Sequence, residues 1–218
     1  MSGAIEAVEE SLNYSFKDAS LLKLALTHPS FGSPNNQRLE FLGDAVLQLC
    51  VSTRLYATMT EADEGVMTRR RALLVQERSL YAAAMRMHIN EALILGRGEQ
   101  LSGGSLRRSI LADSVESVIG AVYLDGGFDA ARQVVARVLD NIDPDDWRDF
   151  KTELQEYTQG QGHGAPEYEI IAQSGPAHAR VFTAVVFVEG KQLGSGEGNT
   201  KKNAQQAAAR AAIGMLGL

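Results

Sequence analysis

The sequence predicts an α+β protein in which an all-α domain is followed by a smaller α-β-β-β-α module. Residues 4 to 138 consist of long stretches with helical periodicity, separated by short clusters of Gly, Pro or Asn. Residues 150 to 218 instead combine strand-like runs with Gly-rich breaks and end in an alanine-rich helix. Between them, residues 141 to 149 place Pro144 among acidic residues without periodicity, which is typical of a solvated linker. We therefore expect domains at residues 1 to 140 and 150 to 218.

The sequence predicts the following helices and strands in the two domains. Helical stretches of the first domain are "DASLLKLALTH", "RLEFLGDAVLQLCVSTRLYATM", "EGVMTRRRALLVQERSLYAAAMRM" and "RSILADSVESVIGAVYL". The second domain begins with a helix over Lys151 to Gln159, followed by strands in "YEIIAQ" and "VFTAVVFV" and a short third strand in "EGKQLGSGEG". Its last helix is expected over Lys201 to Met215, because alanine favours helix.

Composition narrows the possible classes of protein. The 218 residues are 44% apolar and 22% charged, which is ordinary for a globular chain. Cys50 is the only cysteine, so a disulfide framework or a cysteine zinc site within one chain is excluded and a cytoplasmic location is expected. No export signal and no apolar run of about 18 residues is found, so membrane insertion is not expected. The net charge of −6 comes from residues 1 to 149, because residues 150 to 218 hold six basic and six acidic side chains.

Two pairs of carboxylates interrupt otherwise apolar helices. Glu40 and Asp44 lie four residues apart and share a narrow stripe with apolar neighbours on a helical wheel. Asp113 and Glu116 lie three residues apart on one side of a second apolar helix, and Gly120 falls between them on the wheel. A glycine inside a helix costs roughly 1 kcal/mol relative to alanine, so it often marks a close approach by another helix or a ligand.

These four carboxylates would converge if the two helices crossed at those faces, and they would then repel one another unless cations were present. Carboxylate oxygens suit a hard divalent ion, Mg²⁺ above all, so metal-assisted hydrolysis of a phosphodiester follows as the reaction class. The alternative is that each pair is solvated or salt-bridged, as is usual for acids at this spacing. Periodicity alone leaves both interpretations open.

The residues around the carboxylates resemble a known family. The stretch "NQRLEFLGDAVL" closely resembles the signature of the ribonuclease III family, and "SILADSVESVIGAVYLDGG" resembles its second catalytic helix. The resemblance covers nearly the whole chain and implies that residues 1 to 140 are an endonuclease domain. It also implies that Glu40, Asp44, Asp113 and Glu116 bind Mg²⁺, with Mn²⁺ as a substitute. Asp44 and Glu116 are the implied catalytic residues, and Glu116 is the one most directly tied to the metal.

Two further residues of the endonuclease domain gain a role from the resemblance. "EADEGVMTRRRALLV" looks like another family block, in which Glu64 matches an acidic position that lines the cleft near the substrate. The alternative for Glu64 is an acid that complements the dipole at a helix start. Phe41 alone would be interpreted as a core residue, but the matching aromatic of the family fits a pocket on a second subunit. The resemblance therefore implies a homodimer with Phe41 at its interface.

The C-terminal segments "KTELQEYTQGQG", "PEYEIIAQSGPAHARVFTAVVFV" and "GSGEGNTKKNAQQAAARAA" together resemble a double-stranded RNA-binding domain. Lys201 and Lys202 stand at a helix N-terminus, where the backbone N–H groups and the helix dipole already favour a phosphate. Gln155 and Glu156 match positions that touch the minor groove, and His178 matches a loop that contacts 2′-hydroxyls. The alternative for these last three residues is ordinary solvent exposure.

The resemblance implies an endoribonuclease that cleaves double-stranded RNA by Mg²⁺-dependent hydrolysis and leaves 5′-phosphate and 3′-hydroxyl ends with short 3′ overhangs. Ribosomal and other structured RNA precursors are the expected substrates. One alternative is a double-stranded RNA-binding protein that uses the same fold without cleaving, and another is a structural role on a ribosome or other large particle. Gln37 and Pro29 depart from the usual family pattern and bear on substrate preference rather than on the chemistry.

Overall fold

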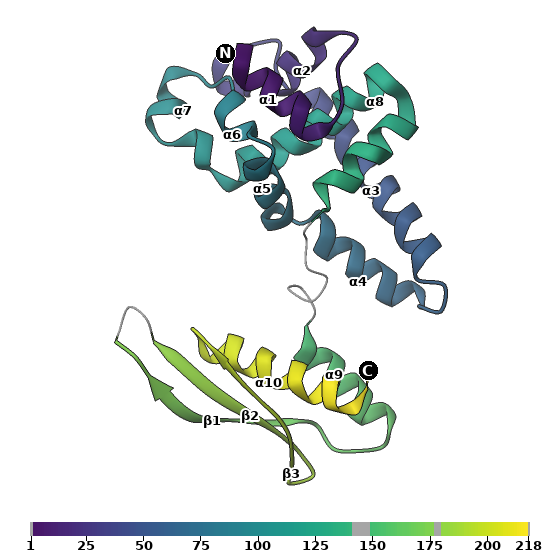
Figure 1. Cartoon of the computed structure of the whole chain (residues 1–218), viewed down its shortest axis with the longest axis vertical. Helices are drawn as coiled ribbons and strands as arrows, with labels where there is room; N and C mark the ends of the chain where they lie inside the picture. The colour runs from purple at the N-terminus through teal and green to yellow at the C-terminus, as the bar shows by residue number, and fades with distance from the viewer. Residues whose placement is uncertain (1, 141–148, 177–179, 218) are drawn as a thin grey trace. The chain divides into compact units, whose positions relative to one another are not determined.

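The computed structural model describes residues 2–140, 149–176 and 180–217, and the chain divides into two compact units, Met1–Ile142 and Asp143–Leu218 (Figure 1). The first unit is helical in its described residues, and the second combines two helices with a three-stranded sheet. The predicted α+β class is therefore confirmed. The predicted linker, residues 141 to 149, lies outside the described residues except for Asp149. No helix in the described ranges is long and apolar enough to cross a membrane.

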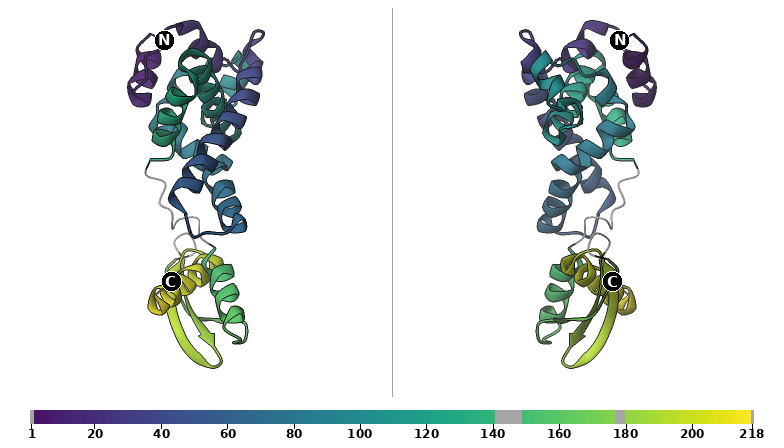
Figure 2. Two further views of the ribbon diagram at one scale, coloured as in Figure 1. Left: turned by 90° about the vertical axis from the view of Figure 1, so that its right-hand side faces the viewer. Right: turned by 90° about the vertical axis from the view of Figure 1, so that its left-hand side faces the viewer.

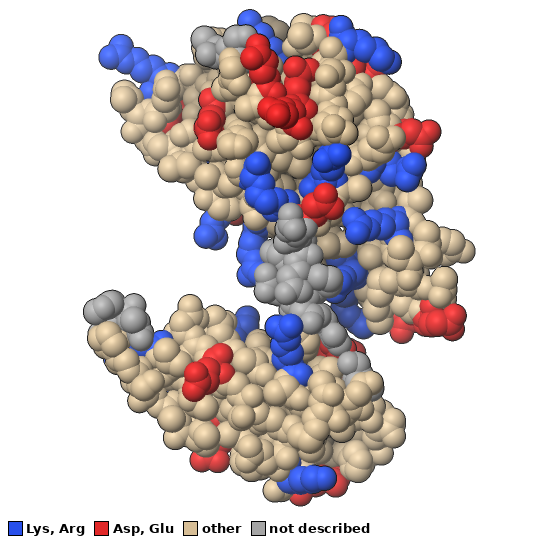
Figure 3. Space-filling view, viewed as in Figure 1, with Lys and Arg blue, Asp and Glu red and all other residues tan. Residues whose placement is uncertain are grey.

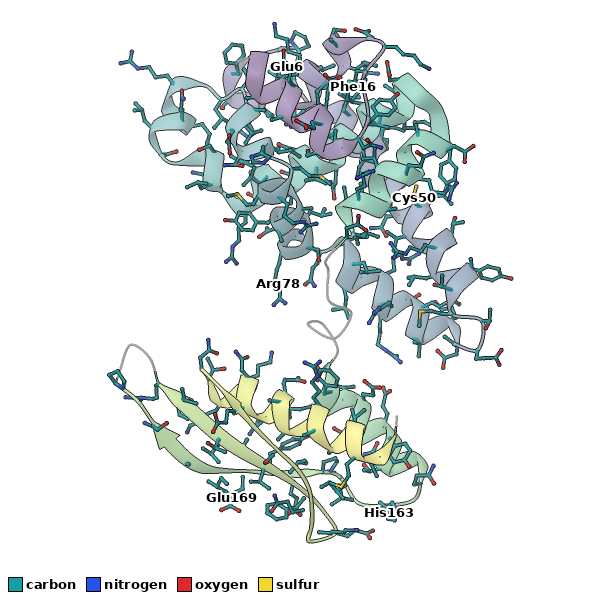
Figure 4. All side chains as sticks on the ribbon, viewed as in Figure 1. Glu6, Phe16, Cys50, Arg78, His163 and Glu169 are labelled. Atoms are coloured by element: carbon teal, nitrogen blue, oxygen red, sulfur yellow. The ribbon has the colours of Figure 1, made fainter. Side chains whose placement is uncertain are left out.

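The first unit is built around two long helices that pack against each other, α3 and α8 (Figures 1 and 2). Its described elements are α1 (Ser2–Leu12), α2 (Ala19–Ala25), the 3-10 helix η1 (Pro29–Phe31), α3 (Gln37–Thr58), α4 (Glu64–Val75), α5 (Glu77–Arg86), α6 (Ile89–Ala92), α7 (Arg97–Leu101), the 3-10 helix η2 (Gly104–Leu106) and α8 (Arg108–Val138). Helices α2 and α5 also pack on α8. The core includes Leu47 and Val51 of α3 and Ile119 of α8, all fully buried, and Cys50 is buried among them (Figure 4).

Glycines allow α3 and α8 to cross at backbone contact. A Cβ on Gly43 would overlap the carbonyl of Glu116, and a Cβ on Gly120 would overlap the carbonyl oxygen of Leu39. Because only a residue without a side chain fits at either position, the crossing point is set by these two glycines. It brings the turn of α3 that carries Glu40 next to the turn of α8 that carries Glu116.

Asp125 fastens the far part of α8 to the N-terminal segment. Its carboxylate accepts hydrogen bonds from the Tyr14 hydroxyl at 2.6 Å and from the backbone N–H groups of Lys17 and Asp18, each at 2.9 Å. Two residues later the helix is interrupted at Gly127, whose φ of 78° lies in the left-handed region that favours glycine. The "LDGG" of the sequence is thus an anchor followed by a helix break.

The second unit places two helices on one face of an antiparallel sheet with strand order β1-β2-β3. Its elements are α9 (Phe150–Gly160), β1 (Glu167–Ser174), β2 (Val181–Val188), β3 (Lys191–Gly198) and α10 (Lys201–Leu216). In the register, Val185 of β2 pairs with Glu169 of β1 and with Ser195 of β3. The order of elements matches the prediction.

Small residues let β3 and α10 approach closely. Cβ atoms on Gly194, Gly196 or Gly198 would overlap backbone or side-chain atoms at the start and middle of α10. Three of the alanines that face them, Ala204, Ala208 and Ala212, are fully buried. A glycine-rich strand is therefore paired with an alanine-rich helix because both surfaces must be flat for the two backbones to pack together.

Candidate functional site

A carboxylate cluster forms where α3 and α8 cross. Glu40 comes from α3, and Asp113 and Glu116 come from one face of α8, where residues three apart are neighbours. One carboxylate oxygen from each of the three lies within 4.8 Å of the other two, and all three residues are half-buried. Three acids from two helices thus meet at one point of the surface.

The protonation of the cluster reflects this crowding. Burial raises the pKa of Glu116 to about 8, and the charges of Asp44, Asp113 and Glu40 act in the same direction. The pKa of Glu40 is also raised, by burial first and then by the charges of Asp113 and Asp44. Without a cation, Glu116 therefore keeps its proton near neutral pH. Because every donor atom is a carboxylate oxygen, the cluster suits a hard divalent cation.

Asp44 occupies the rim of the cluster. It lies one turn after Glu40 on α3, is exposed, and accepts a hydrogen bond from the Gln48 side-chain amide at 3.3 Å. Its oxygens are not among those that meet within 4.8 Å, yet its charge contributes to the raised pKa of both Glu40 and Glu116. Of the four predicted carboxylates, the structure brings three together and places the fourth beside them.

Two residues that sequence reasoning did not single out also act on the cluster. Burial raises the pKa of Asp113, the charge of Glu77 adds to this effect, and His28 opposes it. Glu77 begins α5 and His28 precedes η1, so neither belongs to the two helices that carry the cluster. No spacing rule connects them to Asp113 in the sequence, and only the fold brings them close.

Buried polar contacts hold the two helices of the cluster in place. The Ser117 hydroxyl, fully buried, lies 2.8 Å from the carbonyl oxygen of Asp113 and 3.3 Å from that of Asn36. The same Asn36 carbonyl accepts the backbone N–H of Glu40 at 2.9 Å. These contacts connect the first turn of α3 to the turn of α8 that carries Asp113.

Glu64 lies elsewhere in the unit. It starts α4 and lines a groove of about 290 Å³ between α3 and α4, together with Ser52, Tyr56 and Arg71. Its carboxylate accepts a hydrogen bond from the Thr68 hydroxyl at 2.7 Å. Because Ser52 follows Glu40 by twelve residues on α3, the groove lies roughly 18 Å along the helix from the cluster. Within one chain, Glu64 is not brought to the carboxylates.

An exposed apolar stripe runs along α3, formed by Phe41, Ala45 and Leu49 at four-residue spacing. The side chain of Phe41 is 83% exposed and that of Leu49 is 54% exposed. The interpretation of Phe41 as a core residue is therefore wrong for the single chain. We call these three residues the α3 stripe.

Basic residues of the first unit gather over α4 and α5, as Figure 3 shows on the face in view. Several arginines of this unit, on α4 and at the start of α8, are held in place by other parts of it. Arg71 donates a hydrogen bond to the Ser52 hydroxyl at 3.0 Å. Arg107 pairs with Glu99 at 2.7 Å, and the Arg108 guanidinium lies 5.5 Å from the centre of the Tyr81 ring. These arginines therefore stabilise local structure in the chain.

In the second unit, the predicted RNA-contacting residues lie on the two helices. Gln155 and Glu156 are exposed on α9, and Lys201 and Lys202 are exposed as the first residues of α10. The Thr200 hydroxyl accepts the backbone N–H of Asn203 at 3.1 Å and caps α10, so threonine fulfils the capping role here. His178 lies outside the described residues.

Charge is separated between the two layers of this unit. The helices carry four basic and two acidic residues (Lys151, Lys201, Lys202, Arg210; Glu153, Glu156). The strands and the positions beside them carry two basic and four acidic residues (Arg180, Lys191; Glu167, Glu169, Glu189, Glu197). Glu169, for example, points away from α9 and α10 (Figure 4). The zero net charge of residues 150 to 218 therefore hides a basic helical layer and an acidic sheet.

Comparisons with known proteins cover both units. A family model described as Ribonuclease-III-like matches residues 18–142, and one described as Double-stranded RNA binding motif matches residues 150–216. The chain is 41% identical to Ribonuclease 3 of Magnetococcus marinus over 228 residues, covering 97% of this chain and 93% of that protein. It is 43% identical to Ribonuclease 3 of Listeria welshimeri over 222 residues, covering 97% of each. The nuclease domain of ribonuclease III from Campylobacter jejuni matches with a TM-score of 0.62 and 41% identity, covering 64% of this chain and 99% of that one.

Proposed function

This chain belongs to the ribonuclease III family, and we propose that it hydrolyses double-stranded RNA at the cluster of Glu40, Asp113 and Glu116 with Mg²⁺ as the cofactor. Its class, a double-strand-specific endoribonuclease, follows from the relatives along its whole length. The observation that carries the proposal is the meeting of three carboxylates from two helices within 4.8 Å. Such a cluster is self-repelling unless a cation is bound.

The carboxylates of the site have two proposed roles, binding the metal ion and facing the substrate. Glu40, Asp113 and Glu116 would hold the divalent cation, and Glu116 must release its proton to do so because its pKa lies at about 8. We propose that Asp44, exposed at the rim, adds a fourth carboxylate for the metal and faces the incoming phosphodiester and its attacking water. When bound, a divalent cation supplies water activation and neutralises charge that develops on the leaving oxygen. Mn²⁺ would be accepted as well, since it also prefers oxygen ligands.

The expected products follow from which phosphorus–oxygen bond breaks. We assign the leaving group to the 3′ oxygen, so that the phosphate stays on the 5′ end of the downstream fragment and the upstream fragment ends in a 3′ hydroxyl. We propose that a carboxylate of the site, such as Asp44 at the exposed rim, takes the proton from the attacking water. The family membership supports this assignment.

We further propose a homodimer formed through the α3 stripe. Phe41 and Leu49 are large apolar side chains that face solvent on the single chain, and exposed apolar patches of this kind usually mark an interface. A two-fold axis passing across α3 at Ala45 would place Phe41 of one subunit against the partner's Leu49. The two clusters would then act on the two strands of one duplex and leave short 3′ overhangs.

The same symmetry gives Glu64 a place in catalysis. If the two copies of α3 run antiparallel and cross at Ala45, Ser52 of one subunit lies at the level of the partner's Arg38. The groove that holds Glu64 would therefore come next to the partner's cluster, although it is roughly 18 Å along α3 from its own. We propose that Glu64 lines the cleft of the other subunit.

For RNA binding, we propose that Gln155 and Glu156 of α9 touch the minor groove while Lys201 and Lys202 of α10 meet phosphates across the major groove. The support is the basic helical layer, the position of both lysines at the N-terminus of α10, and the match to the double-stranded RNA-binding motif. His178 keeps its proposed contact with 2′-hydroxyls from the resemblance alone. None of these contacts reads bases in the major groove, so recognition rests on shape and backbone.

We propose ribosomal and other structured RNA precursors in the cytoplasm as the substrates. Recognition by shape and backbone requires a long double-helical stem and no particular sequence, and folded precursor transcripts provide such stems. Comparing the RNA of cells with and without the gene, by sequencing 5′-phosphate ends, tests this proposal. Unchanged ribosomal precursors would remove them from the set of substrates.

A cleavage assay on duplex RNA tests the central proposal. The wild-type protein with Mg²⁺ should cut both strands and leave 5′-phosphate ends, which end labelling detects. The Glu116→Gln variant should bind the duplex with similar affinity and fail to cut it, because the cluster loses a negatively charged ligand. If the wild-type protein shifts the duplex in a gel and leaves it intact, the chain is instead a non-cleaving double-stranded RNA-binding protein.

A further inference from the structure

One glutamine of α10 completes the cap of α9. The side-chain amide of Gln206 donates a hydrogen bond from Nε2 to the Asp149 carboxylate at 2.7 Å, and its Oε1 accepts the backbone N–H of Lys151 at 3.4 Å. Asp149 is the N-cap residue of α9 and also accepts the backbone N–H of Thr152 at 3.2 Å. Both ends of the Gln206 amide are therefore used on the first turn of the neighbouring helix.

Lys151 is held by the same group of residues. Its ammonium donates a hydrogen bond to the Gln205 side chain at 2.8 Å and lies 4.6 Å from the centre of the Tyr168 ring on β1. These two contacts hold the Lys151 ammonium against α10 and β1. The first turn of α9 is thus joined to α10 through Gln205 and Gln206 and to the sheet through Tyr168.

The contacts lie beside the proposed RNA-binding residues. The pKa of Asp149 lies below its ordinary value. Burial acts to raise this pKa, but hydrogen bonds from Gln206 and Thr152 and the charge of Lys202 outweigh burial. A groove of about 450 Å³ is lined by Asp149 and Gln206 and, in addition, by Gln155 and Lys202. The contact between Gln206 and Asp149 therefore lies in the same groove as Gln155, proposed for the minor groove, and Lys202, proposed for the phosphates.

We propose that Gln206 is a positioning residue for RNA binding, because it fixes the start of α9 against α10 and so sets the spacing of the two RNA-contacting helices. The inference rests on the RNA-binding surface proposed above. A-form RNA presents its minor groove and the phosphates of the next major groove at a fixed separation. Gln155 and Lys202 can engage both together only if the two helices keep the matching distance. Without Gln206, Asp149 would still cap α9 through Thr152, so α9 persists and only its attachment loosens.

The effect should appear in RNA binding by the full-length protein without divalent cations, measured on a duplex of about 16 base pairs, the length that one such module spans. Gln206→Ala should weaken binding by about threefold to tenfold, the range expected for lost hydrogen bonds. It should also lower the slope of log Kd against log salt concentration by about one, because one phosphate contact is no longer made together with the others. Gln192→Ala, an exposed glutamine on β3, is the matched control and should change neither quantity.

A reversed pair tests the contact between Gln206 and Asp149 itself. Gln206→Glu alone places a second carboxylate against Asp149 and should weaken binding at least as much as Gln206→Ala. Combined with Asp149→Asn, the repulsion between two carboxylates is removed, the introduced amide can donate to the glutamate side chain, and the net charge equals that of the wild type. The double variant should therefore recover both the affinity and the salt slope toward wild-type values.

The outcomes separate this proposal from the one on which it rests. Lys202→Ala tests the RNA-binding surface itself, and if it leaves affinity and salt slope unchanged, that surface is wrong whatever Gln206 does. If Lys202→Ala weakens binding but Gln206→Ala behaves like the Gln192→Ala control, the positioning role is overturned. It is equally overturned if Gln206→Ala lowers affinity only in proportion to the fraction of unfolded protein, with the salt slope unchanged.

Discussion

At the scale of single residues, Glu116 makes metal binding depend on pH. Its pKa lies at about 8 in the metal-free protein because burial and three neighbouring carboxylates disfavour its charge. A divalent cation can bind only after the proton has left, so the apparent affinity for Mg²⁺ should rise by up to about tenfold per pH unit below about pH 8 and level off above it. Calorimetry in buffers of different ionisation enthalpy measures both the affinity and the proton release. A constant affinity from about pH 6 to about pH 9 would contradict the prediction.

The same residue should lower stability when no metal is bound. A folded-state pKa of about 8 against an ordinary value of 4.5 means that the folded protein binds more protons than the unfolded chain in that interval. Stability of the metal-free protein should therefore fall as pH rises from about 4.5 to about 8. Glu116→Gln should remove this loss and unfold at a higher temperature than wild type above about pH 8, while losing cleavage. Thermal unfolding in a chelator tests it, and an equal or lower unfolding temperature for the variant would speak against the repulsion.

How far the site could be predicted also differs from residue to residue. Helical periodicity placed Glu40 with Asp44 and Asp113 with Glu116 on one side of each helix, because spacing along a helix is a local property. That Glu40 meets Asp113 and Glu116 depends on the crossing of α3 and α8, which periodicity alone left open. Glu77 and His28 could not be found this way, since they reach Asp113 from separate elements through tertiary packing. Periodicity also cannot decide whether an apolar residue such as Phe41 is covered by its own chain or exposed on it.

At the scale of elements, the crossing of α3 and α8 should tolerate no side chain at Gly120. Gly120→Ala gains about 1 kcal/mol of helix propensity but forces a Cβ into the backbone carbonyl of Leu39, which cannot rotate away. Overpacking of this kind typically costs about 1–3 kcal/mol, and the helix shift that relieves it would also separate Glu40 from Glu116. The variant should unfold at a lower urea concentration than the wild type, and its Mg²⁺-dependent cleavage should be slower. Gly98→Ala in α7, with open space around the new Cβ, is the control and should be neutral or slightly stabilising.

The elements themselves were predicted best where their pattern is strong. The last helix was expected over Lys201 to Met215 and is observed as Lys201–Leu216, and the central strand was expected over the residues that form β2. The third strand is longer than expected, covering Lys191–Gly198, because its glycines lack strand propensity of their own. Pairing with β2 and the flat alanine surface of α10 make those residues a strand, and neither can be deduced from a local pattern.

At the scale of the whole molecule, the α3 stripe should decide the oligomeric state. Phe41→Glu puts a charge in the centre of the proposed interface, where burial without a partner costs several kcal/mol, so the protein should become monomeric. Sedimentation equilibrium measures this directly. Leu124→Glu, which changes a 55% exposed apolar residue of α8, is the matched control and should leave the dimer intact. A dimer that survives Phe41→Glu would remove this residue from the interface.

The assignment of Glu64 to the other subunit predicts a specific result for mixed dimers. A dimer of one Glu116→Gln subunit and one Glu64→Gln subunit, isolated through two different affinity tags, contains one fully wild-type site if Glu64 serves its partner's cluster. That site combines the intact cluster of one chain with the intact Glu64 of the other, so the mixed dimer should nick one strand at about the wild-type rate per site. If Glu64 instead served its own cluster, each site would contain one substitution and no strand would be cut at the wild-type rate. Strand-specific end labels distinguish the two results, and the two homodimeric variants, each impaired at both sites, provide the baseline.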